Sequence, residues 1–299
     1  MKTIVVKGLG LMGGSLAKDL RRLFPESAFV GMDANPEHAT RAVELGLVDR
    51  LGEKKDLASA DMVILCIPVN ALTDALVEVM DAVGDQCLVW DTGSTKAQLC
   101  KAVAQHPRRH QYVAAHPIAG TENTGPDAAI YGLFEGKTNI VCEVERSGFD
   151  FQERARKIYE ALGMRIRFMN PDSHDRHIAF VSHLSHISSF MLGKTVMEEE
   201  QSERDIFDMA GSGFESTVRL AKSSPAMWTP IFEQNSQAVL EALGDYINHL
   251  TDFKRKMEEG RWEELFEEMQ QVNGIRSILE GIPGTPSSQK EIEKQEHGK

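Results

Sequence analysis

A histidine followed at once by proline, His116-Pro117, comes directly after the apolar run Tyr112–Ala114. Because proline cannot continue the hydrogen-bonding ladder of a central strand, the pattern predicts a strand that ends here, at the sheet edge where open α/β folds bind their ligands. An imidazole at that edge titrates near neutral pH and can take a proton from a substrate hydroxyl. Thr121 and Glu122 follow closely and are predicted to shape the same pocket. A histidine that only caps a turn is the alternative interpretation.

A second chemical signal is glycine-rich and lies near the start of the chain. Gly8, Gly10 and Gly13 follow the β-branched run Thr3–Val6 and precede a helical pattern. In this context the first glycine allows a tight turn, the second lets backbone approach a pyrophosphate, and the third lets the helix pack close to the strand. We therefore predict a dinucleotide site. Its contacts are predicted at Gly8, Gly10, Leu11, Met12 and Gly13.

The next two apolar runs bear on the identity of the dinucleotide. Ala28–Met32 ends in Asp33, a carboxylate that can accept hydrogen bonds from both ribose hydroxyls and would repel a 2′-phosphate. Asp33 therefore favours NAD over NADP. Met62–Val69 is interpreted as a buried parallel strand closed by Pro68, with its carboxyl end facing the same cofactor.

Ser94 marks another predicted strand end, because it follows the run Cys87–Trp90 and stands just before a helical pattern. Two interpretations stay open: a serine that caps the helix, and a hydroxyl directed into the same crevice as His116. Strands alternate with helices as far as residue 170. This alternation predicts a Rossmann-type, doubly wound α/β sheet.

The strand-like pattern stops at Asn170-Pro171, and we place a domain boundary there, between a dinucleotide-binding domain at 1–170 and an all-α domain at 171–280. Apolar residues recur at helical spacing in four segments, at about 172–199, 214–222, 225–259 and 262–279. They exceed what a core of this size can hide from water, so they predict a helical dimerisation domain and a homodimer. Residues 281–299 are polar without periodicity and are predicted to be a disordered tail.

Composition excludes several classes of protein. The formal net charge of -12 argues against a nucleic-acid partner, because phosphate backbones demand basic surfaces. The four cysteines are scattered without a Cys-x-x-Cys pair, which favours free thiols over a metal site or disulfides. No signal peptide and no apolar stretch long enough for a bilayer are present, so we expect no membrane partner and a cytoplasmic protein.

The helical half carries its own candidates for chemistry. His183 and His186 lie three residues apart, on neighbouring turns of one helix face, a geometry that also suits a metal. No carboxylate or cysteine cluster completes a coordination sphere, so we predict no metal; satisfied core histidines are the alternative. Arg219 lies on an otherwise apolar segment, where a guanidinium can bind a substrate carboxylate through two parallel hydrogen bonds or simply be solvated.

Taken together, these motifs resemble the prephenate/arogenate dehydrogenases of tyrosine biosynthesis, from Gly8 to about Leu279. A glycine fingerprint alone would be weak evidence, but an ordered set of five motifs is far more specific. The motifs are the glycine fingerprint, the Gly93-Ser94 turn, the run His116 to Glu122, Ser182-His183-Leu184-x-His186, and Arg219 followed by Ala221-Lys222-Ser223-x-Pro225-x-Met227-Trp228.

The resemblance implies roles for individual residues. His116 matches the catalytic histidine that hydrogen-bonds the ring C4 hydroxyl of the substrate, and Ser94 matches the serine that supports it. Arg219 matches the arginine that binds the ring carboxylate. His186 matches a second, substrate-side histidine, and Trp228 a tryptophan near the substrate's side chain.

One departure from the pattern concerns the surroundings of Arg219. Thr121 and Glu122 match residues that line the family's pocket, as expected. Some relatives, however, carry an acidic residue three positions before the arginine, where this chain has Ser216. An ion pair made at that position in relatives is therefore absent here.

The reaction that the resemblance implies is an NAD-dependent oxidative decarboxylation. His116 takes the proton of the C4 hydroxyl as hydride leaves C4, and loss of the ring carboxylate makes the ring aromatic. Prephenate is preferred as the substrate, with 4-hydroxyphenylpyruvate as the product, and arogenate is the alternative. A β-hydroxyacid dehydrogenase and a non-catalytic NAD sensor are the other hypotheses. β-Hydroxyacid dehydrogenases generally use a catalytic lysine on their helical domain, whereas the candidate here is a histidine on a sheet strand.

Overall fold

The structure is a computed structural model that describes residues 1–202 and 205–280. The predicted tail at 281–299 lies outside the described residues. Packing divides the chain into two compact units, Met1–Val239 and a second unit that begins at Leu240. This division differs from the boundary at residue 170, because helices that follow the sheet pack with it in the first unit. The boundary at 170 stays a prediction about domains.

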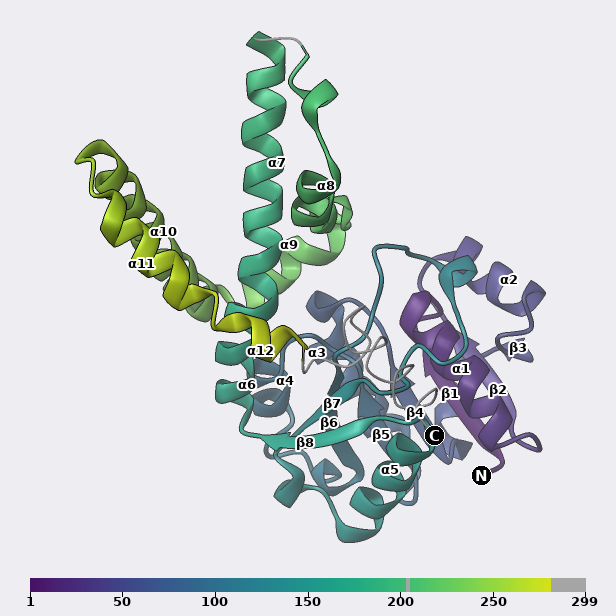
Figure 1. Ribbon diagram of the computed structural model, residues 1–299. Helices are drawn as coiled ribbons and strands as arrows, with labels where there is room; N and C mark the ends of the chain where they lie inside the picture. Colours follow the sequence, from purple (N-terminus) through teal and green to yellow (C-terminus); the bar gives the residue numbers. More distant parts are fainter. Residues whose placement is uncertain (203–204, 281–299) are drawn as a thin grey trace, which may run out of the picture. The chain divides into compact units, whose positions relative to one another are not determined.

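An eight-stranded sheet forms the centre of the first unit, in the order β3-β2-β1-β4-β5-β6-β7-β8 (Figure 1). All neighbouring strands run parallel except β6 and β7, which are antiparallel. The strands are β1 (Thr3–Lys7), β2 (Ala28–Met32), β3 (Arg50–Leu51), β4 (Met62–Leu65), β5 (Leu88–Asp91), β6 (Tyr112–Pro117), β7 (Thr138–Cys142) and β8 (Arg165–Met169). The predicted doubly wound sheet is confirmed.

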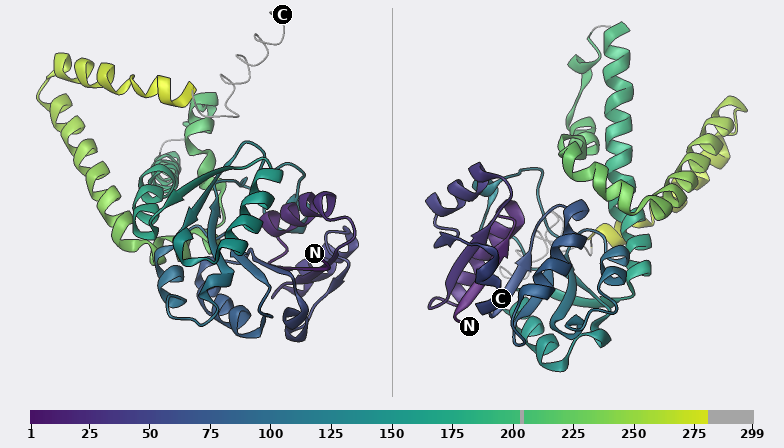
Figure 2. Two further views of the ribbon diagram at one scale, coloured as in Figure 1. Left: turned by 90° about the horizontal axis from the view of Figure 1, so that it is seen from below. Right: turned by 180° about the vertical axis from the view of Figure 1, so that it is seen from behind.

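Helices cover both faces of this sheet (Figure 2). The helices around the sheet are α1 (Leu11–Leu23), α2 (Pro36–Glu44), α3 (Val69–Ala82), α4 (Ala97–Ala102) and α5 (Phe149–Ala161). Those that follow are α6 (Pro171–Ile178), α7 (Leu184–Ser202), α8 (Ser212–Val218), α9 (Pro225–Gln234), α10 (Ser236–Glu258), α11 (Trp262–Val272) and α12 (Ile275–Glu280).

The alternation of strand side chains explains the two layers of helices. Successive residues of a strand point to opposite faces of the sheet. In β1, Ile4 and Val6 join the core beneath α1 and α5, whereas Val5 joins the core beneath α3 and α4. Because Ile4–Val6 of β1, all of β4 and Leu88–Trp90 of β5 are apolar and buried, both faces must be covered, which is the condition for a buried parallel sheet.

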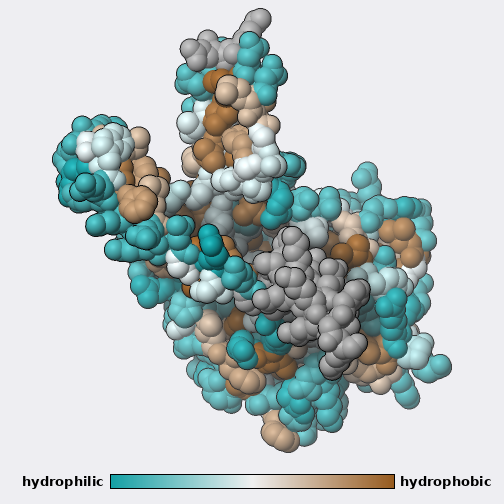
Figure 3. Space-filling model, viewed as in Figure 1, coloured by the Kyte–Doolittle hydropathy of each residue, from teal (hydrophilic) through white to brown (hydrophobic). Residues whose placement is uncertain are grey.

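A π-helical turn, Ala179–His183, joins α6 to α7 in what the sequence predicts as one continuous helix. Such turns hold one residue more than the α-helical path needs. α7 then rises from the sheet layer with α8 packed beside it (Figure 1). Its surface carries exposed apolar side chains, Met191, Leu192 and Met197, and apolar surface is visible along this part of the unit in Figure 3.

The second unit holds most of α10 together with α11 and α12. Lys256 of α10 pairs with Glu268 of α11 at 2.8 Å, and Leu265 is buried in this unit. Many of its large apolar residues are nevertheless exposed. They are Leu240, Ile247, Leu250, Phe253, Met257, Trp262, Phe266, Met269, Val272, Ile275, Ile278 and Leu279.

The described part of the chain has neither a membrane-crossing helix nor a metal-binding cluster. None of its helices combines the length and apolar character that crossing a membrane requires. Within residues 1–202 and 205–280, no three His, Cys, Asp or Glu side chains form a group that could hold a metal ion. All four cysteines are free thiols, buried at Cys87, Cys100 and Cys142 and half-buried at Cys66.

Candidate active site

His116 lies inside β6 rather than beyond its end, so the predicted strand end before Pro117 is wrong. The strand reaches Pro117 because its neighbours change along its length. β5 pairs with β6 only at Tyr112 and Val113, whereas β7 pairs with it from Ala114 to Pro117. Pro117, which has no N–H, therefore interrupts no hydrogen bond to β5. Because β5 ends before it reaches His116, His116 still lies at the predicted carboxyl edge of the sheet.

The His116 ring is buried and is bonded to a second histidine. Its Nδ1 lies 2.8 Å from Nε2 of His174, in α6, and Nδ1 of His174 lies 2.7 Å from Oδ1 of Asp175. His116 is 8% exposed and His174 2%. Nε2 of His116 has no hydrogen-bond partner among the described residues and is not fully buried. It is therefore the ring nitrogen that is open to a ligand.

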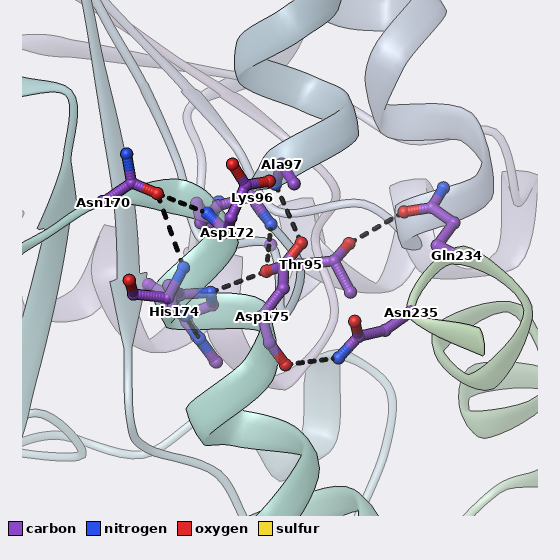
Figure 4. A network of polar contacts seen from close by, with 12 residues as sticks. Thr95, Lys96, Ala97, Asn170, Asp172, His174, Asp175, Gln234 and Asn235 are labelled. Carbon is purple, nitrogen blue, oxygen red and sulfur yellow. Dashed lines mark hydrogen bonds and ion pairs between the residues drawn. The ribbon is translucent and has the colours of Figure 1, made fainter. Parts of the chain in front are cut away.

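Asp175 anchors this chain of contacts to the turn before α4. Its Oδ1 accepts the backbone N–H of Lys96 and its Oδ2 that of Ala97, both at 2.8 Å. Its own carbonyl accepts from the side-chain amide of Asn235 at 2.6 Å. Figure 4 shows Asp175 between this turn, His174 and Asn235. The residues after β5, the first turns of α6 and the end of α9 are thereby held in one network.

Lys96 also forms a fully buried ion pair. Its Nζ contacts Oδ2 of Asp91, and both side chains have no exposed surface. The hydroxyl of Tyr112 donates to the other Asp91 oxygen at 2.7 Å. Gly93 is required beside this pair, because a Cβ there would lie 2.5 Å from a Leu72 methyl and 2.9 Å from Asp91.

Burial dominates the electrostatics of the histidines. It holds the pKa of His116 well below the ordinary value, and positive charge at His174, Lys96 or His183 would lower it further. Burial also lowers the pKa of His174, although Asp175 opposes that shift. The pKa of His183 falls to about 4, again mainly through burial. A neutral His116 at physiological pH is the state that a base requires.

Ser94 lies in the same turn as Lys96 and is half-buried. Helix α4 begins at Ala97 with Lys96 at its N-cap position, so the interpretation of Ser94 as the capping residue is wrong. Among the described residues, the partner of His116 Nδ1 is His174 rather than Ser94. A supporting role for Ser94 therefore has to act at the open side of the His116 ring, and it stays a prediction.

His183 and His186 meet an aromatic side chain rather than a metal. The His186 ring stacks on Trp228 of α9, with centroids 3.5 Å apart and planes inclined by 25°. His183 lies edge-on to Trp228 at 5.8 Å, and its Nδ1 is 3.2 Å from the side-chain amide nitrogen of Asn235. Nε2 of His183 and Nε1 of Trp228 are buried without partners in the described residues. The two predicted substrate-side residues, His186 and Trp228, are thus in direct contact.

Arg219 has an acidic partner that the sequence pattern did not indicate. Its guanidinium lies 3.7 Å from the carboxylate of Glu122, across from the loop that follows β6. Both are substantially exposed, at 53% and 39%, so the pair is open to solvent and contributes little to stability. Thr121 is exposed in the same loop, with its hydroxyl oxygen accepting from the Asn123 N–H at 3.2 Å.

The glycine loop has the geometry that a dinucleotide requires. Gly8 has a φ of +97°, which other residues rarely adopt, and a Cβ on Gly13 would lie 1.8 Å from the Gly8 carbonyl oxygen. Gly10 differs, since a Cβ there would meet nothing closer than the Gly125 nitrogen at 3.9 Å. Open space above Gly10 is what the approach of a pyrophosphate needs. Leu11 and Met12 begin α1, and exposed Pro68 precedes α3, each at the carboxyl end of a strand.

Asp33 lies beside this loop, at the end of β2. Its Oδ2 accepts the N–H of Leu9 at 2.7 Å and its Oδ1 that of Asn35 at 2.8 Å. Each oxygen keeps a second lone pair for a ribose hydroxyl. The adjacent depression along α2 has a volume of about 650 Å³, and Arg41 in its lining is paired with Asp127 at 2.7 Å. The carboxylate of Asp33 would repel a 2′-phosphate, so these residues fit NAD.

The sequence interpretation missed His174, Asp175, Lys96 and Asn235. His174 is 58 residues from His116 along the chain, and Asp175 is 79 residues from Lys96, so spacing alone does not reveal these contacts. One signal was present, however. Asn170-Pro171 is a helix start, and a histidine and an aspartate in the turn that follows, at the end of the sheet, are positioned to face its ligand edge.

Two family descriptions match the sequence in tandem. "Prephenate dehydrogenase, nucleotide-binding domain" matches residues 16–168, and "Prephenate dehydrogenase, dimerization domain" matches residues 170–271. Among curated relatives, the cyclohexadienyl dehydrogenase of Zymomonas mobilis is 29% identical over 93% of this chain and 96% of its own length. The prephenate dehydrogenase of Bacillus subtilis is 28% identical over 94% of this chain and 76% of its own length.

Solved structures show the same likeness in three dimensions. The prephenate dehydrogenase of Aquifex aeolicus, in complex with hydroxyphenyl propionate and NAD+, has a TM-score of 0.85 and 31% identity, covering 93% of this chain and 98% of its own. The arogenate dehydrogenase of Synechocystis has a TM-score of 0.74 and 30% identity, covering 92% and 99%.

Proposed function

The chain belongs to the prephenate dehydrogenase family, and from this premise we propose that it catalyses the NAD-dependent oxidative decarboxylation of prephenate to 4-hydroxyphenylpyruvate. The membership makes it an NAD-dependent oxidoreductase, since the nucleotide-binding half matches and a 31% identical structure holds NAD+. The match extends through both halves of the chain. It therefore favours this reaction over that of a β-hydroxyacid dehydrogenase.

One observation carries the proposal: a buried histidine with one open ring nitrogen lies at the carboxyl edge of a dinucleotide-type sheet. His116 is neutral at physiological pH because burial lowers its pKa. Its Nδ1 is already bonded, which leaves Nε2 to accept a proton from a substrate hydroxyl. This is the place in an open α/β fold where cofactor and substrate meet.

The residues of the chain supply alignment and a base. Bound along Gly8–Gly13 and Asp33, the nicotinamide cofactor supplies the acceptor for the hydride that leaves C4. His116 Nε2 takes the C4 hydroxyl proton. The electron pair of the bond to the departing carboxylate enters the ring as carbon dioxide is released, and the C4 oxygen takes a proton back from His116 to give the phenol. Arg219 binds a carboxylate of the substrate and holds C4 at the required position.

Glu122 gives Arg219 a partner until an anionic substrate arrives. The pair is exposed and long at 3.7 Å, so a substrate carboxylate can replace Glu122 at little cost. We assign His186, which stacks on Trp228, to the neighbourhood of the substrate's side chain. That side chain is what distinguishes prephenate, a keto acid, from arogenate, an amino acid.

The test is a spectrophotometric assay of the full chain with prephenate and with arogenate, each with NAD and with NADP. We expect turnover with prephenate and NAD. In the variant His116→Asn we expect kcat to fall by about 10²- to 10⁴-fold, the usual contribution of a positioned base, while NAD affinity is unchanged. Near-normal turnover in that variant would contradict the role of His116. Activity with arogenate alone would make arogenate the substrate in place of prephenate. No activity with any of the four pairs of substrate and cofactor would contradict the proposed reaction.

We further propose that the protein works as a homodimer through its helical half. The supporting observations are the exposed apolar side chains of α10, α11 and α12 and the matched dimerization domain at 170–271. Exposed apolar surface on this scale marks an interaction site, and identical chains supply a self-complementary partner.

A further inference from the structure

We propose that His174 and Asp175 are positioning residues that fix the tautomer of His116, with the hydrogen on Nδ1 and the lone pair on Nε2. The inference rests on the proposed role of His116 as the base of the reaction. It concerns a neutral imidazole, which carries one hydrogen and offers either nitrogen as an acceptor. Only the tautomer with a bare Nε2 can take a proton at the open side of the ring.

Asp175 determines which atoms donate and which accept in this chain of hydrogen bonds. Two backbone N–H groups, those of Lys96 and Ala97, point at its two oxygens at 2.8 Å. A backbone N–H can only donate, so these contacts hold the carboxylate as an acceptor. The Asp175 oxygen that also lies 2.7 Å from His174 Nδ1 therefore receives the hydrogen of that nitrogen.

The hydrogen on His174 Nδ1 determines the direction of the hydrogen bond between His174 and His116. A neutral His174 with its hydrogen on Nδ1 presents a lone pair at Nε2, and Nε2 lies 2.8 Å from Nδ1 of His116. That contact is a hydrogen bond only if His116 Nδ1 donates. A charged His174 would reverse it, because both of its nitrogens would then be donors, and burial opposes that charge.

The fold holds the pair rigidly enough to serve this purpose. The side chain of Asn170 caps α6 by accepting the N–H groups of Asp172 and Ser173, which sets where the first turn lies. Asn235 clamps the backbone of Asp175 from α9, and the Lys96–Asp91 ion pair holds the turn opposite. The charges facing the two rings are thus Asp175 on one side and a neutralised pair on the other.

A direct test is the nitrogen spectrum of the histidines in the full chain. Protein labelled with 15N-histidine is measured at mildly alkaline pH, and the signals of His116 are assigned by their loss in His116→Asn. We expect wild-type His116 to be protonated at Nδ1. Finding the hydrogen at Nε2 would overturn the proposal, whatever the substrate of the enzyme proves to be.

Activity measurements test the consequence for the base. In His174→Leu the acceptor is removed, and we expect kcat to fall by about 10²- to 10⁴-fold with KM nearly unchanged; setting the wrong tautomer behind the histidine of the serine-protease triad costs about 10⁴ in kcat. His174→Gln offers an amide oxygen near the same place and should recover most of the loss. His177→Leu, an exposed histidine of the same helix, is the matched control.

The outcomes separate this proposal from the proposed function. Wild-type kcat in His174→Leu, or a lower kcat in which His116 keeps its Nδ1 hydrogen and His174→Gln recovers nothing, would show a structural role and overturn the assignment. A wild-type protein that is silent on every substrate, yet shows the Nδ1 tautomer, would instead overturn the reaction and leave the hydrogen-bond geometry standing.

Discussion

Asp91 and Lys96 show how much a single buried residue can hold together. The Asp91 carboxylate receives the Lys96 ammonium, the Tyr112 hydroxyl and the backbone N–H groups of Gly93 and Ala115. All of these groups lie on β5, β6 or the turn that carries the network around His116. Removing one partner from such a pair leaves a charge in the interior without compensation.

We predict that Lys96→Met destabilises the protein by about 3 to 5 kcal/mol, the cost of breaking a buried ion pair from one side. Urea unfolding of the full chain measures the change. Lys101→Met, at an exposed position of the adjacent helix, is the control and should shift stability by about 0.5 kcal/mol or less. An unchanged unfolding midpoint in Lys96→Met would show that Asp91 tolerates the loss of its counter-ion.

At the residue scale, the sequence indicated the proposed base, His116, and not the residues that support it. His116 follows an apolar run and precedes a proline, and that local pattern was enough to predict its place at the sheet edge. The partners His174 and Asp175 belong to a helix that docks there only through tertiary packing. The helix start at Asn170-Pro171 indicates that they lie at the end of the sheet, but nothing local indicates their contact with His116.

At the scale of elements, the glycine loop separates folding from binding. Gly13 touches the backbone of Gly8, whereas Gly10 has room above it and a φ of -73°, which alanine adopts readily. The two glycines of one motif therefore serve different purposes. Gly13 serves the packing of the fold, and Gly10 is predicted to serve the cofactor.

We predict that Gly10→Ala leaves the unfolding midpoint of the cofactor-free protein nearly unchanged but raises the Kd for NAD about tenfold or more, a loss of at least about 1.4 kcal/mol. The added methyl occupies the space that the pyrophosphate needs. Gly13→Ala is the comparison, and it should destabilise the fold itself. Calorimetric titration and thermal unfolding check both variants, and normal NAD binding by Gly10→Ala would place the pyrophosphate elsewhere.

The elements themselves were largely predictable, because apolar runs and glycine turns mark them locally. The predicted and observed elements differ where contacts with distant parts of the chain determine the ends of an element. β4 ends at Leu65, before the proline that was taken to close it, because α3 begins at Val69. β6 runs through Pro117 because its pairing partner changes from β5 to β7 before that residue. The π turn was not predicted, since its residues, Ala179–His183, include no glycine or proline that would mark a break in a helix.

At the scale of the whole molecule, the buried histidines couple stability to pH. The pKa values of His116, His174 and His183 are all lowered in the folded chain, mainly by burial. The unfolded chain therefore binds more protons than the folded one below the ordinary histidine pKa of about 6.5. Stability must then fall as the pH is lowered.

We predict that the free energy of unfolding decreases from about pH 6.5 downwards, by up to about 1.4 kcal/mol per pH unit for each of these histidines. For His183 the decrease continues to its pKa of about 4. Urea unfolding at a series of pH values measures the slope. His116→Asn should reduce it and His177→Gln should leave it unchanged, whereas a flat profile in the wild type would contradict the burial argument.

The proposed homodimer rests on the apolar surface of the helical half. Trp262, Phe266 and Met269 are exposed on one stretch of α11, where an ordinary monomer surface would be polar. Phe266→Lys should yield a monomer in light scattering, because a lysine is costly to bury in an apolar interface. Glu267→Lys, at the next position, tests charge alone and should keep the dimer. A dimer that survives Phe266→Lys would place the interface on another surface.

The π turn at Ala179–His183 has a consequence for how specificity can change. An α-helix turns by about 100° per residue, so one residue removed from this turn would rotate everything after it by that angle. His174 and Asp175 precede the turn, and His186 follows it. The extra residue therefore separates two parts of this helical segment. His174 and Asp175, before the turn, keep their orientation toward His116. The helix face that carries His186, after the turn, depends on the extra residue and can change independently.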